Sequence, residues 1–174
     1  MDRCEPCESG TFQENKGEST CKQCSQGTYA DREGATNCTV CESGYIASEQ
    51  GMNRCDLCEP GTFQDSEGES TCEKCPQGTY ADREGATNCT ACEAGHVASE
   101  EGMYRCKPCK PGEFQDQKRM SRCKQCNMGQ YQDQTGQTSC VPCQYNWYSS
   151  KDGQELCLKC PCLLYTSDAA DDRV

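Results

Sequence analysis

Cysteine is the residue type whose number and spacing in this sequence point to chemistry. The chain has 174 residues, of which 21 are cysteine. Pairs of the form C-x2-C recur with a step of 17 residues and begin at Cys4, Cys21, Cys38, Cys55, Cys72, Cys89, Cys106, Cys123, Cys140 and Cys157. Thiols at such spacing can be oxidised to disulfides, bind zinc as thiolates or take part in thiol–disulfide exchange.

Three features favour disulfides over zinc. Asn37 and Asn88 each begin an N-C-T sequence that fits the acceptor for N-glycosylation, a modification of the secretory pathway. The net charge of -11 is unlike the basic face of zinc-finger arrays. Any C-x2-C pair could also share a metal ion with either neighbour, which invites misfolding. An intracellular array of Cys4 zinc sites is therefore the alternative, and a redox enzyme is disfavoured because the pairs lack a helical context.

Two pairings of the cysteines are open. One closes the 13-residue stretch between neighbouring pairs in the same way every time, and the other crosses neighbouring pairs and repeats every 34 residues. Similar blocks recur every 51 residues, so the crossed scheme would give identical blocks opposite roles, which favours the uniform scheme. That scheme joins Cys7–Cys21, Cys24–Cys38, Cys41–Cys55, Cys58–Cys72, Cys75–Cys89, Cys92–Cys106, Cys109–Cys123, Cys126–Cys140 and Cys143–Cys157.

Other positions share the 17-residue period and define a hairpin-like unit. Each unit has a glycine, then a large apolar residue, then a second glycine, with Asn146 and Arg119 as the exceptions. In one unit, residues 27–30 predict a short strand, residues 31–34 a turn and residues 36–38 the returning segment. We expect the first glycine to let the backbone pass close to a cystine. Each unit is expected to contact only its neighbours.

The composition indicates a fold that is held covalently. With 1 Trp, 3 Phe and a mean hydropathy of -0.95, the chain lacks the apolar mass for one large core. We therefore predict a small disulfide-rich fold, mostly β or irregular, built as an elongated tandem array of 17-residue hairpin-like units. The acidic charge argues against nucleic acid, and no apolar stretch is long enough to insert in a membrane. With one histidine, His96, neither an enzyme nor a cofactor is expected.

The motif C-x2-C-x2-G-T-Y/F, followed by an acidic turn with glycine and then by A-T-N/S-C, resembles the ephrin-receptor-like cysteine-rich repeat. Residues 85–89 are especially close to that pattern, and the cysteine-rich modules of tumour-necrosis-factor receptors are more distantly similar. The resemblance covers residues 4 to about 160. It implies an extracellular stalk or ligand-binding segment of a larger secreted or membrane-anchored protein, with protein or glycan ligands as the expected partners.

Residues 1–161 are expected to form one array of about nine 17-residue units, grouped in 51-residue triplets, since residues 27–39 and 78–90 are identical. After Pro161 the register ends. Residues 162–174 resemble the translation of a sequencing adapter followed by read-through, and we expect them to form a non-native or disordered tail. Because the chain starts inside a repeat and lacks an apolar leader, we expect it to be a piece of a longer protein.

Few residues stand out as candidates for binding. Residues 105–124 carry seven Lys or Arg side chains against two carboxylates, a local basic patch that could meet sulfated glycans or an acidic protein. Within it we select Lys118, Arg119 and Arg122. Trp147 lies in the one aromatic cluster, and aromatic side chains are enriched at binding hot spots. The sequence suggests no catalytic or metal-binding residue.

Overall fold

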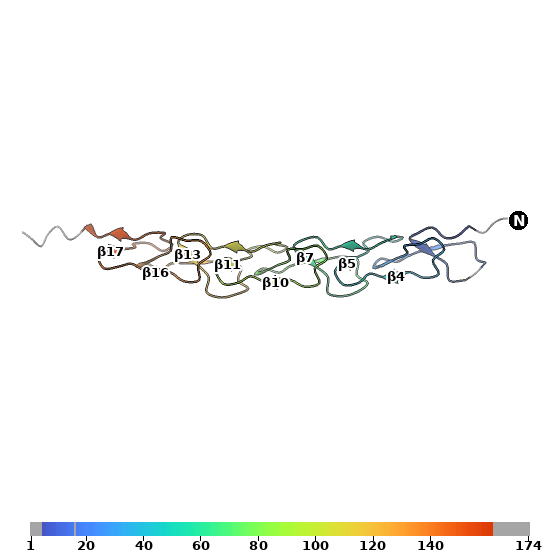
Figure 1. Ribbon diagram of the computed structural model, residues 1–174, viewed down its shortest axis with the longest axis horizontal. Helices are drawn as coiled ribbons and strands as arrows, with labels where there is room; N and C mark the ends of the chain where they lie inside the picture. The colour runs from blue at the N-terminus through green and yellow to red at the C-terminus, as the bar shows by residue number, and fades with distance from the viewer. Residues whose placement is uncertain (1–4, 16, 162–174) are drawn as a thin grey trace, which may run out of the picture. The chain divides into compact units, whose positions relative to one another are not determined.

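The computed structural model describes residues 5–15 and 17–161, and the statements below concern those residues. They form nine antiparallel hairpins of two-residue strands (Figure 1). The first five hairpins are β1 (Thr11–Phe12) with β2 (Lys22–Gln23), β3 (Thr28–Tyr29) with β4 (Thr39–Val40), β5 (Tyr45–Ile46) with β6 (Asp56–Leu57), β7 (Thr62–Phe63) with β8 (Glu73–Lys74), and β9 (Thr79–Tyr80) with β10 (Thr90–Ala91). The last four are β11 (His96–Val97) with β12 (Lys107–Pro108), β13 (Glu113–Phe114) with β14 (Lys124–Gln125), β15 (Gln130–Tyr131) with β16 (Val141–Pro142), and β17 (Trp147–Tyr148) with β18 (Leu158–Lys159).

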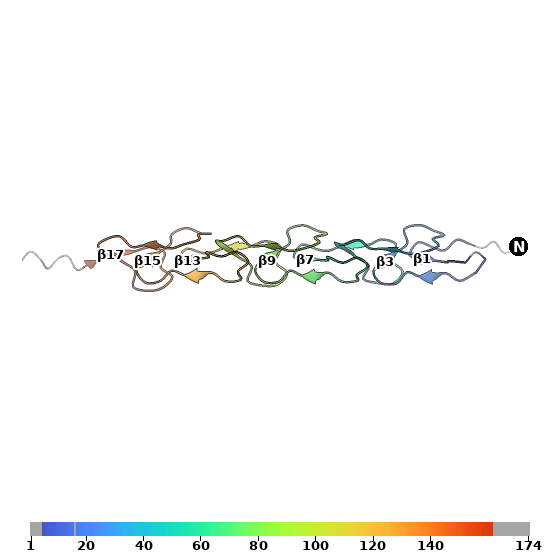
Figure 2. The same ribbon diagram turned by 90° about the horizontal axis from the view of Figure 1, so that it is seen from below.

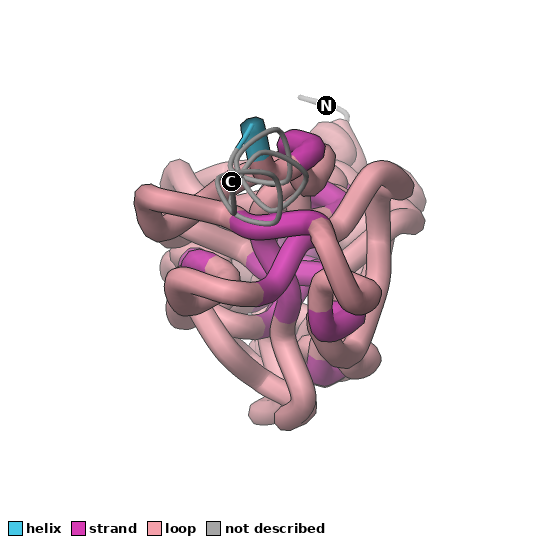
Figure 3. The backbone as a smooth tube through the Cα atoms, turned by 90° about the vertical axis from the view of Figure 1, so that its left-hand side faces the viewer, coloured by secondary structure: helices cyan, strands magenta, loops and turns pink. Residues whose placement is uncertain are grey.

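Strands make up only a small part of the chain, and loops form most of it (Figure 3). The first strand of several hairpins starts with threonine, whose hydroxyl donates to the carbonyl three residues earlier, as Thr28 does to Ser25 at 2.7 Å. This side-chain turn sets the direction of a strand that is too short to be stable alone. No helix in the described part of the chain is long and apolar enough to cross a bilayer.

The returning strand lies later than the sequence predicted. In the second hairpin, Tyr29 pairs with Thr39 and Thr28 with Val40, so the ladder closes between the two cysteines of a C-x2-C pair rather than at residues 36–38. The reason is that the segment after the turn bonds to the preceding hairpin. The Gly34 N–H donates to the Cys7 carbonyl at 2.7 Å, and the Gln13 N–H donates to the Ala35 carbonyl at 3.0 Å.

Nine disulfides hold the described hairpins, each joining residues 14 apart in the sequence. The pairing in the structure is the uniform one, from Cys7–Cys21 to Cys143–Cys157, and the crossed alternative does not occur. Each bond ties the start of a hairpin to the residue just before its returning strand, with the Cα atoms 5.7 Å apart in Cys24–Cys38. Cys160 forms no disulfide with another described cysteine.

The interior consists of sulfur and small side chains. The first cysteine of most disulfides is fully buried, as at Cys24, Cys41 and Cys58, which are 0 % exposed. Alanines such as Ala47 and Ala98 fill the remaining space, whereas the larger apolar residues of the first strands are mostly only half-buried. Among the described residues, the largest fully buried side chains are Gln115 and seven cysteines. A small disulfide-rich fold of hairpins, as expected, therefore replaces an apolar core.

The described chain divides into two compact units, which we consider separately. The first contains Met1–Cys92 and Ala98–Cys106, and the second contains Glu93–Val97 and Lys107–Val174. Within each unit the hairpins follow one another in chain order (Figure 1). In the first unit, β1 and β7, which are one 51-residue triplet apart, lie along the same edge (Figure 2). The triplet period of the sequence thus corresponds to a return to the same edge.

Contacts within each unit reach beyond the next hairpin, so the expectation of neighbour-only contacts was wrong. The Gly27 N–H donates to the Ala47 carbonyl of the following hairpin at 2.9 Å. Gly27 also lies against the carbonyl group of Gly68, two hairpins further on, where a Cβ atom would overlap the backbone. The same approach joins Gly112 to Gly153 in the second unit. The first glycine of these hairpins therefore makes room for another glycine. Its backbone also passes close to a cystine, as expected, because the Gly27 carbonyl accepts from the N–H of the disulfide-bonded Cys41 at 2.9 Å.

Candidate functional site

The strongest candidate site is the hairpin of β13 and β14 with its preceding residues, here called the basic hairpin (residues 110–125). It carries five cations and two carboxylates and lies wholly in the second unit. Glu113 pairs with Gln125 and Phe114 with Lys124, in the register of the other hairpins. The selected residues Lys118, Arg119 and Arg122 all lie in the loop between the two strands. The fold thus brings three of the four predicted binding residues into one loop.

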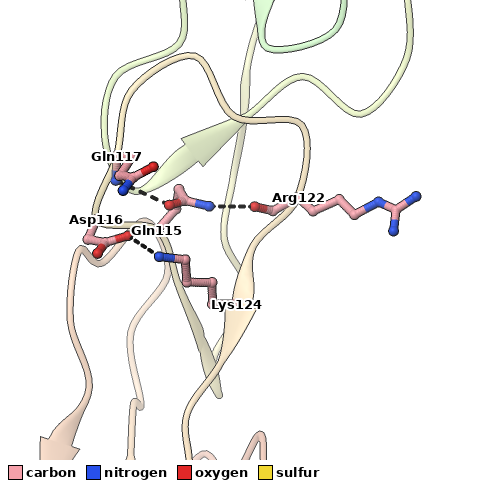
Figure 4. A network of polar contacts seen from close by, with 5 residues as sticks. All are labelled: Gln115, Asp116, Gln117, Arg122 and Lys124. Carbon is pink, nitrogen blue, oxygen red and sulfur yellow. Dashed lines mark hydrogen bonds and ion pairs between the residues drawn. The ribbon is translucent and has the colours of Figure 1, made fainter.

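A buried glutamine holds this loop in shape (Figure 4). The Gln115 side chain is 0 % exposed, and its Nε2 donates to the Arg122 carbonyl at 2.6 Å. Its Oε1 accepts from the Gln117 N–H at 3.1 Å. Both ends of the amide are satisfied, as a buried polar group requires. The amide therefore bridges the two ends of the segment that carries Lys118 and Arg119.

The backbone at Arg119 is unusual for a residue with a side chain. Its φ is +61°, in the left-handed region, where the other described hairpins place glycine at the equivalent turn position. A side chain costs about 1–2 kcal/mol in this conformation. Asn146, with φ of +70°, is the other described non-glycine residue with positive φ, and asparagine tolerates that region better. Arginine is thus held at the turn in spite of a backbone cost, and such outliers cluster at functional positions.

Two of the five cations in the basic hairpin are already paired. Lys118 Nζ lies 2.7 Å from Glu93 Oε2, and Lys124 Nζ donates to Asp116 Oδ1 at 2.6 Å. The hydrogen bond from Lys124 lowers the pKa of the Asp116 carboxyl below its usual value. Both pairs are open to solvent, so each contributes little to stability. Lys110, Arg119 and Arg122 are exposed and form no ion pair with a described carboxylate.

The hairpin of β7 and β8 shows the same scaffold with the opposite charge. Residues 59–74, which precede the basic hairpin by 51 positions and are here called the acidic counterpart, carry five carboxylates and one lysine. The glutamine clamp, meaning the side-chain amide that bridges the two ends of the loop, is present here as well, because Gln64 Nε2 donates to the Thr71 carbonyl at 2.8 Å. At equivalent positions Glu59 corresponds to Lys110, Glu67 to Lys118, Gly68 to Arg119, Thr71 to Arg122 and Glu73 to Lys124. Charge can therefore vary on this scaffold without a change in the clamp.

Trp147 belongs to a different hairpin. It lies on β17, 47 % exposed, and lines a groove of about 230 Å³ with Tyr131, Gln144, Leu156 and Cys157. A groove of about 340 Å³ occupies the equivalent place in the first unit, where Tyr29, Glu42, Tyr45, Arg54 and Cys55 stand at the corresponding positions and Thr39 and Val40 complete its lining. The two grooves share a position in the repeat, but their polar side chains differ. The Trp147 groove is lined by fewer charged groups than its equivalent.

The remaining candidates from the sequence are the two glycosylation asparagines, the histidine and any metal-binding group. Asn37 and Asn88 are exposed, and each is next to a disulfide cysteine. His96 lies on β11 and is half-buried. In residues 5–15 and 17–161, no three or more His, Cys, Asp or Glu side chains are grouped to hold a metal ion. The predicted tail, residues 162–174, lies outside the described residues.

Sequence reasoning missed the glutamine clamp. Glutamine usually occupies the surface, so nothing in its type marks it as buried. A signal was present in the period, because the clamp residues Gln13, Gln64 and Gln115 recur every 51 residues, whereas buried alanine stands at this position in the two hairpins after each of the first two. Gln132 repeats the clamp in the next hairpin by donating to the Ser139 carbonyl at 2.8 Å. The position therefore holds glutamine in four described hairpins, alanine in four and Ser149 in the last.

Comparison with known proteins agrees with this architecture. A family model described as tyrosine-protein kinase ephrin type A/B receptor-like matches residues 1–41, 44–92, 95–139 and 129–171. The comparison with curated proteins gave no match. The matched segments cover nearly the whole chain and repeat with it, in keeping with the tandem hairpins and the uniform disulfides. The chain belongs to the ephrin-receptor-like family of cysteine-rich repeats.

Proposed function

We propose that this chain is an extracellular spacer and interaction module, a disulfide-stapled segment of a larger secreted or membrane-anchored protein. The observation that carries the proposal is that each described hairpin has its own disulfide and that, among the described residues, no large apolar side chain is fully buried. Disulfides persist in oxidising compartments and are reduced in the cytosol. A fold of this kind keeps its shape only outside the reducing interior of the cell.

The repeated hairpins support a role in spacing and presentation. Backbone hydrogen bonds join each described hairpin to the next within its unit, as from the Gly51 N–H to the Cys24 carbonyl at 2.8 Å. Repeats that are bonded in this way expose much of their surface to solvent and offer it to partners. The family to which the chain belongs consists of structural and interaction modules rather than catalytic domains. We therefore expect protein or glycan ligands and no turnover of a substrate.

The zinc alternative is disfavoured by the same cysteines. Zinc binds thiolates, and eighteen of the described cysteines are bonded to one another as nine disulfides. A chain that used these residues as Cys4 sites would contain metal and release it to a chelator with loss of fold. Oxidised and zinc-bound forms therefore differ both in mass and in their response to chelation.

The test is to express the chain behind a secretion signal in animal cells and to recover it from the medium. The intact mass should rise by two hydrogens per cystine on reduction, and peptide mapping without reductant should give the uniform pairing. Treatment with a glycosidase should reveal sugar at Asn37 and Asn88, and alanine at Thr39 or Thr90 should remove it from the matching site.

The control is the same chain produced in a reducing cytosol with added zinc. We expect this material to be unfolded and free of stoichiometric metal, since its cysteines cannot form disulfides there. A folded product that contains one zinc ion per four cysteines would overturn the proposal. So would secreted material with free thiols throughout.

A further inference from the structure

We infer that the loop of the basic hairpin is a binding site for a sulfated polysaccharide. The inference deepens the proposed function and rests on it, because sulfated polysaccharides surround cells and do not fill the cytosol. Its core is the loop that holds Lys118, Arg119 and Arg122, with Lys110 and Lys124 beside it. Four observations support the inference. They are the local positive charge, the loop fixed by Gln115, the unfavourable backbone conformation of Arg119, and the opposite charge of the acidic counterpart on the same scaffold.

Charge in this chain is segregated. The basic hairpin has a net charge of +3, from five cations and two carboxylates, whereas the whole chain has -11. The rest of the chain therefore carries -14. Screening at physiological salt limits attraction and repulsion to about 8 Å, so the acidic remainder does not cancel the patch at contact. A ligand of dense negative charge gains from the loop and is repelled by acidic hairpins such as the acidic counterpart, which favours binding at this place.

The loop is ordered before any ligand binds. Gln115 bridges the ends of the segment through hydrogen bonds to the Arg122 carbonyl and the Gln117 N–H. Its complete burial keeps water from competing for these bonds. A fixed loop loses less conformational freedom on binding, and this raises affinity without added contacts. The surface charges of the loop are thus displayed on a rigid base.

Arg119 occupies a turn position at which the backbone conformation favours glycine over arginine. Glycine fits the turn, and the acidic counterpart has Gly68 there with φ of +75°. A guanidinium presents a planar fork of donors that matches the oxygens of a sulfate group in a bidentate manner. Arg122 offers a second fork from the same loop and forms no ion pair with a described carboxylate. The two arginines would hold sulfates, while Lys118 and Lys124 would exchange their carboxylate partners for the ligand.

An acidic protein is the competing ligand. Carboxylates on a peptide are spaced by a flexible backbone, so their binding costs more conformational entropy for each charge. Exposed lysine–carboxylate pairs are also worth little, as the open pairs of Lys118 and Lys124 illustrate. A sulfated polysaccharide carries a high linear charge and releases condensed counterions when cations bind it. The observations therefore favour the polysaccharide.

The experiment measures binding of the folded, secreted chain to heparin by calorimetry at several salt concentrations. We expect log K to fall with log salt with a slope of roughly -3 to -4, since each of five cations contributes about -0.7. The variant K110E/K118E/R119G/K124E gives the basic hairpin the residues that the acidic counterpart already uses. It should fold normally, keep the Gln115 clamp and bind heparin at least about tenfold more weakly.

The matched gain-of-charge variant is E59K/E67K/G68R/E73K. It should add a second site and raise the stoichiometry of heparin binding. Equal binding by the wild type and by the K110E/K118E/R119G/K124E variant would overturn the inference, as would no binding of the wild type at about 50 mM salt. Binding of polyglutamate as tight as that of heparin would also overturn it and point to an acidic protein. Failure here leaves the disulfide and secretion tests of the proposed function unaffected.

Discussion

Replacing Gly27 with alanine should separate two costs that glycine avoids in the second hairpin. Gly27 has φ of +78°, and a Cβ atom there would overlap the carbonyl group of Gly68, two hairpins away. Gly34 in the same hairpin has φ of +68°, yet its Cβ would meet only Pro6 Cβ at 3.5 Å, an ordinary contact. Alanine at Gly34 is therefore destabilising only through its backbone conformation, whereas alanine at Gly27 is also destabilising through steric overlap with Gly68.

The magnitudes follow from these contacts. An L-residue in the left-handed region costs about 1–2 kcal/mol, which both variants share. Overpacking against backbone adds about 1–3 kcal/mol at Gly27 alone. The Gly27→Ala variant should therefore lose about 2–5 kcal/mol of local stability and the Gly34→Ala variant about 1–2 kcal/mol.

The assay is amide hydrogen exchange by NMR with the disulfides intact, read at the Gly68 N–H, which donates to the Cys41 carbonyl at 2.8 Å. Exchange that proceeds through local opening reports the free energy of that opening. Gly27→Ala should exchange about 5- to 150-fold faster than Gly34→Ala at this amide. Equal exchange rates in the two variants would refute the claim that hairpins separated by one intervening hairpin are in close contact.

Three further predictions concern the clamp and the basic hairpin. Gln64→Ala should lower the local stability of β7 and β8 by about 1–3 kcal/mol, because the Thr71 carbonyl and the Ser66 N–H each lose a hydrogen bond to the amide, with faster amide exchange confined to that hairpin. Arg119→Gly should stabilise its hairpin by about 1 kcal/mol by relieving the left-handed backbone, measured as about fivefold slower exchange in β13 and β14. The Asp116 carboxyl should titrate at lower pH than in a Lys124→Ala variant, as followed by NMR of the carboxyl carbon. A lowered carboxyl pKa stabilises the fold above the unfolded-state pKa and stops doing so as pH falls through the folded-state pKa, and for this exposed pair the effect on overall stability should be too small to measure.

Cysteine spacing predicted the parts of the fold that covalent geometry controls. The 17-residue step and the 51-residue blocks favoured the uniform pairing, the same in every hairpin, and this is the pairing that the structure has. The period also predicted a strand before each turn from residues such as Thr28 and Tyr29, and a returning strand after it, although that strand lies at Thr39–Val40 rather than at residues 36–38. Asn146 and Arg119 break the glycine pattern, yet both adopt the positive φ of the glycines they replace. Features that depend on a single hairpin, namely its disulfide and its turn conformation, could thus be predicted from the sequence.

Contacts between hairpins could not be predicted from the sequence, for physical reasons. The returning strands are only two residues long and mostly exposed, as at Lys22–Gln23 and Asp56–Leu57, so no apolar alternation marks them. The close approach of Gly27 to Gly68 involves backbone atoms only, so no pair of matching side chains in the sequence indicates it. The buried amide of Gln115 likewise looks like a surface residue until the loop closes around it. The basic residues were visible as a group, but their fixed loop was not.

Disulfides, rather than an apolar interior, hold these hairpins together. The most direct test is the two-dimensional amide NMR spectrum of the secreted chain before and after complete reduction and alkylation in the presence of a chelator. We expect dispersed, exchange-protected amide signals in the oxidised protein and collapsed, unprotected ones in every hairpin after reduction. A reduced, metal-free chain that keeps its dispersion and protection would contradict this expectation.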